Sequence, residues 1–214
     1  IFTIFGRLNY LWSNMENNVK FSKNVILVDV SFLDETVSDI KSFLGERLGR
    51  TLPDVDLPAW LSYLALDAGL REGDNEIQVL LVHGGEVSAL PHCRPADLKE
   101  LDGVACRTPL GEFAFSRVSS AGMAASSDLF IDLMHLALDS ADVECLALVP
   151  FHRLYAGKVE EELRKCLGKQ EKQKEAGRVV YFMMAAPQVP IPCVTDSVLY
   201  SLSHVLGIKP EELE

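Results

Sequence analysis

Short apolar runs rich in β-branched residues constrain the fold of this chain more than any other feature. They span Val25 to Val30, Glu76 to His83, Val143 to Val149 and Val179 to Ala185, with Phe113 to Val118 as a further candidate. Runs of this length that lack a polar face are typical of strands buried on both sides of a parallel sheet. The chain is therefore expected to build a central sheet that helices cover on both faces.

Amphipathic segments separate these runs. Apolar residues at helical spacing predict helices over Asp34 to Gly49, Ala59 to Leu70, Asp128 to Ala141 and Gly157 to Leu167. Gly49 suits the residue that ends the first helix, and Ser126 or Ser127 is expected to cap the third. Strands that alternate with helices predict an α/β fold, a three-layer sandwich with a mainly parallel central sheet.

Three segments are expected along the chain: an N-terminal extension (1–23), the α/β domain (24–186), and a proline connector with a C-terminal helix (187–214). Thr195 or Asp196 would cap that last helix, which we expect to pack away from the main sheet, on a partner subunit. The extension lacks an initiator Met, and one hypothesis places the natural start at Met15.

Charge and cysteine usage narrow the class of protein. With 31 acidic and 20 basic residues the formal net charge is −11, which argues against nucleic acid as a partner. No apolar run approaches the ~20 residues that span a bilayer, so no membrane contact is expected. The five cysteines include no CxxC pair, which favours a reducing, cytoplasmic location.

Candidate site residues follow from the rule that ligands bind beyond the carboxyl ends of parallel strands. Asp29 closes the first strand, and its alternative role is to cap the segment that follows. His83 closes the second strand, while His152 and Arg153 follow the strand that ends at Val149. These last three residues are the candidates for binding a small molecule.

Two further groups of residues each allow two interpretations. Asp128, Asp132, His135 and Asp139 share one helical stripe, which either binds a divalent cation or simply faces solvent. His92-Cys93-Arg94 either holds a thiolate activated by the neighbouring cation or is a surface loop. It is also the only close Cys/His pair, so the sequence does not predict a zinc site.

The strand ending in Asp29, the helix carrying Asp132 and the order of the elements together resemble the NYN branch of the PIN-like nuclease superfamily, over residues 24–186. That resemblance implies a PIN/NYN-like or related Rossmann-like topology for the sheet. It also implies hydrolysis of RNA with Mg²⁺ or Mn²⁺ held by Asp29 and Asp132, with Asp128 nearby. The sequence departs from the family's pattern at Phe32, where Asn is usual, and at Ser126, where an acidic residue is usual. It departs again at Val149-Pro150-Phe151-His152-Arg153, which stands where the family has an acidic turn.

Three hypotheses for function follow. The first is a non-catalytic PIN/NYN-like interaction module that binds a protein partner or self-associates through the C-terminal helix. The second is a weak Mg²⁺- or Mn²⁺-dependent RNA phosphodiesterase that uses Asp29, Asp132 and Asp128. The third is a small-molecule α/β hydrolytic enzyme that uses the strand-end His and Arg residues. If Asp29 and Asp132 meet in an open cleft, the nuclease hypothesis gains; if Phe32 or Phe151 fills that cleft, it fails.

Overall fold

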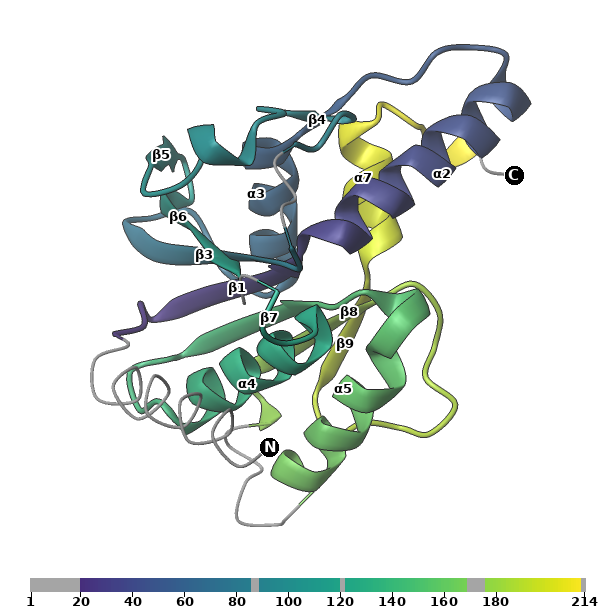
Figure 1. Ribbon diagram of the computed structural model, residues 1–214. Helices are drawn as coiled ribbons and strands as arrows, with labels where there is room; N and C mark the ends of the chain where they lie inside the picture. Colours follow the sequence, from purple (N-terminus) through teal and green to yellow (C-terminus); the bar gives the residue numbers. More distant parts are fainter. Residues whose placement is uncertain (1–19, 86–88, 120–121, 169–175, 213–214) are drawn as a thin grey trace.

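The central sheet organises the molecule, whose computed structural model describes residues 20–85, 89–119, 122–168 and 176–212 (Figure 1). Within these residues the sheet has seven strands, and helices flank both of its faces. In spatial order the strands are β5 (Ala105–Thr108), β6 (Gly111–Ser119), β3 (Asn75–His83), β1 (Asn24–Asp29), β7 (Cys145–Val149), β8 (Val179–Met183) and β9 (Val194–Ser197). The predicted α/β class with a mainly parallel sheet is confirmed.

The strand order fixes where the chain reverses direction across the sheet. All neighbouring strands are parallel except β5 and β6. Numbered along the chain, the six parallel strands lie in the order 3-2-1-4-5-6, which is a doubly wound order. The chain proceeds from β1 through β3 to β6 on one side of β1, and then crosses through α4 to β7 on the other side. The crevice of this topology therefore lies at the carboxyl ends of β1 and β7.

Helices lie on both faces of the sheet (Figure 1). One face carries α2 (Val30–Leu48), α3 (Leu57–Asp67) and α7 (Val198–Val205); the other carries α4 (Ser126–Asp139) and α5 (His152–Leu167). Two short strands, β2 (Val55–Asp56) and β4 (Cys93–Arg94), pair beside α3, and the 3₁₀ turns are η1 (Leu98–Glu100) and η3 (Pro210–Glu212). No described helix has both the length and the apolarity to cross a bilayer.

The central strand shows why the apolar runs become strands. β1 pairs with β3 on one side and β7 on the other, and every residue from Val25 to Asp29 is buried. A strand between two helix layers needs apolar side chains on both faces. At the start of β6 a side chain on Gly111 would place its Cβ 2.1 Å from the Asn75 carbonyl oxygen, so only glycine permits this pairing.

Helix boundaries differ from the prediction where a cap decides them. α2 begins at Val30 rather than Asp34, because Asp29 itself is the N-cap, and it ends at Gly49 as predicted. The predicted cap of α4 is wrong: Ser126 lies inside the helix and Ala125 precedes it without a side-chain bond. Ser197, rather than Thr195 or Asp196, caps α7 through the Leu199 amide.

The C-terminal segment packs with the α/β domain instead of away from it. Residues 194–197 form β9 at the sheet edge, and α7 packs against α3. Trp60 Nε1 donates a hydrogen bond to Ser201 Oγ at 3.1 Å, and both residues are buried. The apolar face of α7 is therefore buried within the same chain. Most of the expected extension, including Met15, lies outside the described residues.

Removing the acceptor of this bond tests whether α7 is part of the domain. Ser201→Ala leaves the Trp60 indole N–H buried without its partner, which should lower the free energy of unfolding by about 1–3 kcal/mol in urea denaturation. The matched control is Tyr200→Ala on the exposed side of the same helix, expected to change it by less than about 0.5 kcal/mol. Equal effects of the two substitutions would show that α7 does not depend on this anchor.

Candidate functional site

Asp29 is enclosed at the carboxyl end of β1. Its side chain is 0 % exposed and both carboxylate oxygens accept hydrogen bonds. The Phe32 amide donates to Oδ1 at 3.0 Å, which caps α2, and the Tyr155 hydroxyl donates to Oδ2 at 2.6 Å. Of the two roles that the sequence left open for Asp29, the structure shows the capping role.

Aromatic side chains fill the space around this carboxylate. Tyr155 lies in the first turns of α5, where the helix is kinked, and its ring contacts Phe130 of α4 with centroids 5.7 Å apart. Phe32 is 1 % exposed and meets the His152 ring edge-on at 4.9 Å, while Phe151 is 6 % exposed. The phenol and the rings therefore stand where an open acidic cleft would have to be.

The ionisation of Asp29 reflects this burial. Loss of solvent raises the pKa of the Asp29 carboxyl, while the hydrogen bonds from Tyr155 and Phe32 act to lower it without cancelling the effect. A carboxylate that holds a metal ion must be deprotonated and must offer a lone pair to the ion. Asp29 does not meet the second condition, because both of its oxygens already accept hydrogen bonds within the fold.

The other two predicted metal ligands lie on α4. Asp128 is exposed in the first helical turn, where its charge complements the helix dipole. Asp132 is half-buried; burial is the largest cause of its raised pKa, and Asp128 adds to it while His135 opposes it. Among the described residues, no group of three or more metal-ligating side chains contains Asp29, Asp128 or Asp132. Coordination of Mg²⁺ or Mn²⁺ by this set stays a prediction.

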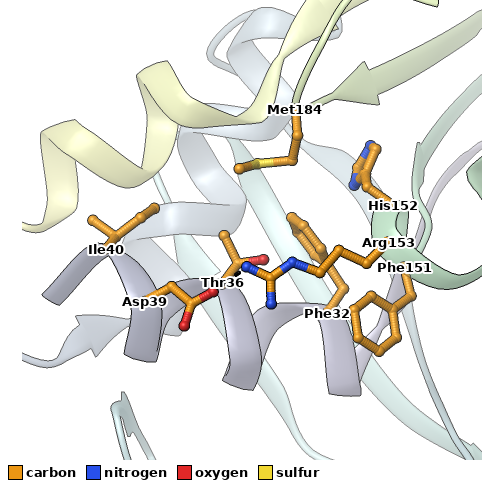
Figure 2. A pocket seen from close by; sticks show the side chains of 8 residues that line it. All are labelled: Phe32, Thr36, Asp39, Ile40, Phe151, His152, Arg153 and Met184. Atoms are coloured by element: carbon orange, nitrogen blue, oxygen red, sulfur yellow. Dashed lines mark hydrogen bonds and ion pairs between the residues drawn. The ribbon is translucent and has the colours of Figure 1, made fainter. Parts of the chain in front are cut away.

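A pocket of about 250 Å³ opens beside the buried carboxylate, between α2 and the start of α5 (Figure 2). Its lining consists of Phe32, Thr36, Asp39 and Ile40 from α2, Phe151, His152 and Arg153 after β7, and Met184 after β8. A second pocket of about 420 Å³ runs along α5 and shares His152 and Met184 with the first. Both lie at the carboxyl edge of the sheet, where a doubly wound fold binds ligands.

His152 forms part of the wall between the two pockets. Its Nε2 lies 2.8 Å from the Phe182 carbonyl oxygen, so Nε2 carries the proton and donates. Burial lowers the pKa of His152 to about 4, which keeps the ring neutral at physiological pH. Nδ1 is then an acceptor, and it is buried with no hydrogen-bond partner in the part of the chain that the structure describes.

Arg153 spans the mouth of the first pocket. Its guanidinium forms ion pairs with Glu35 and Asp39, which lie four residues apart on α2. The arginine side chain is largely exposed, so solvent screens these pairs and they contribute little to stability. They join the first turn of α5 to α2 and neutralise the charge of the guanidinium, and Figure 2 shows Asp39 beside it.

The remaining predicted residues lie apart from this pocket. His83 is buried at the end of β3, where Nδ1 lies 3.2 Å from the Gly85 carbonyl oxygen, and it lines neither pocket. Cys93 is buried in β4, and burial raises the pKa of its thiol to about 12 despite Arg94. The buried strand position of Cys93 thus contradicts both alternatives for this residue, the thiolate activated by Arg94 and the surface loop. The structure brings His152 and Arg153 together and leaves His83 out.

Sequence reasoning missed the residues that decide this site. Tyr155 reaches Asp29 from 126 positions away, and Met184 enters the pocket wall from the end of β8. No spacing rule connects them to Asp29 or to α2. The start of α5 offered one signal, since Phe151 and His152 follow Pro150 directly at a strand end, where parallel sheets place functional groups.

Fold and site together define a doubly wound α/β protein with a small crevice beside a sealed strand-end carboxylate. The first strand–helix turn, Asp29-Val30-Ser31, contains no glycine, so it lacks the phosphate cradle of dinucleotide-binding proteins. The chain belongs to a family of unknown function, DUF6621, whose model matches residues 18–213. No curated protein and no solved structure matches it.

The buried imidazole should make stability depend on pH. The pKa of His152 is lowered from 6.5 to about 4 in the folded state. The stabilisation that the buried neutral imidazole gives to the folded state is therefore complete above pH 6.5, and it is lost as the pH falls toward about 4. The loss should be about 3 kcal/mol across this window. Urea denaturation at several pH values should show a shallower decline for His152→Gln than for the wild type.

The matched control is His204→Gln, since His204 is exposed on α7. This variant should keep the wild-type slope. A decline as steep in His152→Gln as in the wild type would contradict a buried neutral His152.

Proposed function

We propose that this chain is a PIN/NYN-like α/β module that acts by binding rather than by catalysis. The observation that supports this most directly is the state of Asp29, which is fully buried with Tyr155 and Phe32 donating to its two oxygens. The carboxylate at the end of the first strand has become a structural acceptor. It connects β1, α2 and α5 and leaves no open face toward solvent.

The residues around Asp29 do not fit the Mg²⁺ or Mn²⁺ ions that the resemblance implies. Hydrolysis with such ions requires several carboxylates around an open coordination sphere. Here the Tyr155 hydroxyl takes the second oxygen of Asp29, and the segment from Val149 to Arg153 supplies no carboxylate. No metal-dependent step is therefore assigned to this site.

The partner of such a module is a protein or a second copy of the chain. The acidic net charge of −11 opposes binding to nucleic acid. Self-association through the C-terminal helix would have to use the outward side of α7, because its apolar face already packs on α3. Tyr200 lies on that outward side and is 74 % exposed.

A comparison of isosteric variants tests the loss of catalysis. Asp29→Asn keeps an oxygen for the Phe32 amide and offers an N–H to the Tyr155 oxygen, so the variant should fold. We expect wild type, Asp29→Asn and Asp132→Asn to give the same background cleavage of a labelled single-stranded RNA in Mg²⁺ or Mn²⁺. Calorimetric titration with Mn²⁺ should likewise not distinguish wild type from Asp29→Asn.

Cleavage by the wild type that both substitutions abolish would overturn the proposal. A heat of Mn²⁺ binding that disappears only in Asp29→Asn would do the same. Thermal melting of each variant confirms that it is folded before its activity is compared.

The unpartnered Nδ1 of His152 favours a second candidate function, the binding of a small molecule in the pocket of Figure 2. A ligand that fits this wall needs a hydrogen-bond donor for Nδ1 and an apolar body to pack between Phe32 and Phe151. Met184 lines the same pocket, and its unbranched thioether can adjust to admit such a group. A ring nitrogen with so low a pKa is a recognition group rather than a general base at neutral pH.

Two probes of similar shape separate donor recognition from simple apolar binding. Benzyl alcohol carries a donor, whereas benzoate carries only acceptors. We expect benzyl alcohol to shift the His152 imidazole resonances saturably in ¹⁵N NMR and benzoate to leave them unchanged. His152→Phe should abolish binding of the alcohol and His204→Phe should preserve it. Equal responses to both probes, or binding that survives in His152→Phe, would contradict a donor-specific pocket.

A further inference from the structure

Three metal-ligating side chains meet where α4 packs against α5, on the sheet face opposite α2 and α3 (Figure 1). They are His135 of α4 and Glu162 and Cys166 of α5. Among the described residues this is the one group of at least three His, Cys, Asp or Glu side chains whose ligand atoms all lie within 4.8 Å of one another. We propose that His135, Glu162 and Cys166 form a binding site for a zinc-type transition-metal ion.

The spacing of the three ligands suits one ion. Glu162 and Cys166 lie four residues apart, which places both on the same face of α5, and His135 faces them from the neighbouring helix. Two ligands at this spacing on a helix, with a third from elsewhere, is an arrangement that zinc proteins use. In a tetrahedral zinc site the ligand atoms lie about 3.5 Å apart, so closing this group around an ion needs side-chain movements of about 1 Å.

The His135 ring provides an independent sign that a cation belongs here. Nε2 of His135 lies 3.4 Å from Glu162 Oε2, yet it is buried and makes no hydrogen bond within the described part of the chain. The lone pair of a neutral imidazole and a carboxylate oxygen repel each other when they face. A proton or a metal ion between them makes the contact favourable, and a metal ion would gain Cys166 as a third ligand, since the three ligand atoms lie within 4.8 Å of one another.

Ligand chemistry selects the class of ion. A set of one nitrogen, one oxygen and one sulfur suits Zn²⁺ and its neighbours in the first transition row, whereas Mg²⁺ and Ca²⁺ take oxygen ligands. Lys165 Nζ pairs with the other carboxylate oxygen of Glu162 at 2.9 Å, which holds that side chain in place and leaves Oε2 toward His135. Three protein ligands leave a fourth position for water.

This site is distinct from the cation site that the acidic stripe of α4 suggested. His135 belongs to that stripe, but its imidazole pairs across to Glu162 of α5. Asp128 and Asp132 do not join the group. A bound ion would link the two helices that cover one face of the sheet, so its main expected effect is on stability.

Cobalt substitution tests the site in the full chain, because Co²⁺ reports its ligands through absorption. We expect one Co²⁺ per chain, a sulfur-to-cobalt charge-transfer band, and displacement of the cobalt by Zn²⁺. Cys166→Ala should remove the band, and His135→Gln should weaken Co²⁺ binding by more than about tenfold. The matched control is Cys106→Ala, a half-buried cysteine on β5, which should bind Co²⁺ as the wild type does.

Thermal melting supplies a second readout that does not depend on the spectrum. Zn²⁺ should raise the melting temperature of the wild type and of Cys106→Ala, and it should leave Cys166→Ala and His135→Gln unchanged. In EDTA all four proteins should melt alike, which shows that the variants fold. A band that persists in Cys166→Ala, binding unaffected by His135→Gln, or no binding of Co²⁺ or Zn²⁺ by the wild type would overturn the site.

Discussion

The hydrogen bond from the Tyr155 hydroxyl to Asp29 is the interaction on which the arrangement of this molecule depends. A buried carboxyl group is costly unless hydrogen bonds replace its water. Here the replacement comes from two helices at once, the Phe32 amide at the start of α2 and the Tyr155 phenol near the start of α5. One side chain at the end of the central strand therefore positions the helices that lead away from both sides of the switch point.

This arrangement moves the accessible crevice outward. With Tyr155 and Phe32 packed over Asp29, the open space lies one layer further from the sheet, between α2 and the first turn of α5. Its polar groups are consequently those of the helix starts, His152 and Arg153, instead of the strand-end carboxylate. This crevice at the carboxyl edge of the sheet offers a neutral imidazole and an arginine already paired with Glu35 and Asp39.

The sequence predicted those parts of the fold that depend on local composition. The run from Val25 to Val30 became the central strand because only a strand between two helix layers buries that pattern on both faces. β9 was missed because Val194–Ser197 is a polar, partly exposed edge strand, and its pairing comes from the backbone of β8. The cap of α4 was predicted wrongly because Ser126, although a residue suited to capping, lies inside the first turn.

The rule that ligands bind beyond the carboxyl ends of parallel strands located residues of the site but did not predict their roles. It selected Asp29, His152 and Arg153 from the sequence, and all three lie at the carboxyl edge of the sheet. Whether Asp29 faces solvent or core depended on Tyr155, which is 126 positions away, and no local pattern encodes that contact. The group at His135 was hidden for the same reason: Glu162 and Cys166 show an i, i+4 spacing common to any amphipathic helix. Only the packing of α4 on α5 gives that spacing a third ligand, so tertiary contact, rather than sequence, turns ordinary helical residues into a set that can hold an ion.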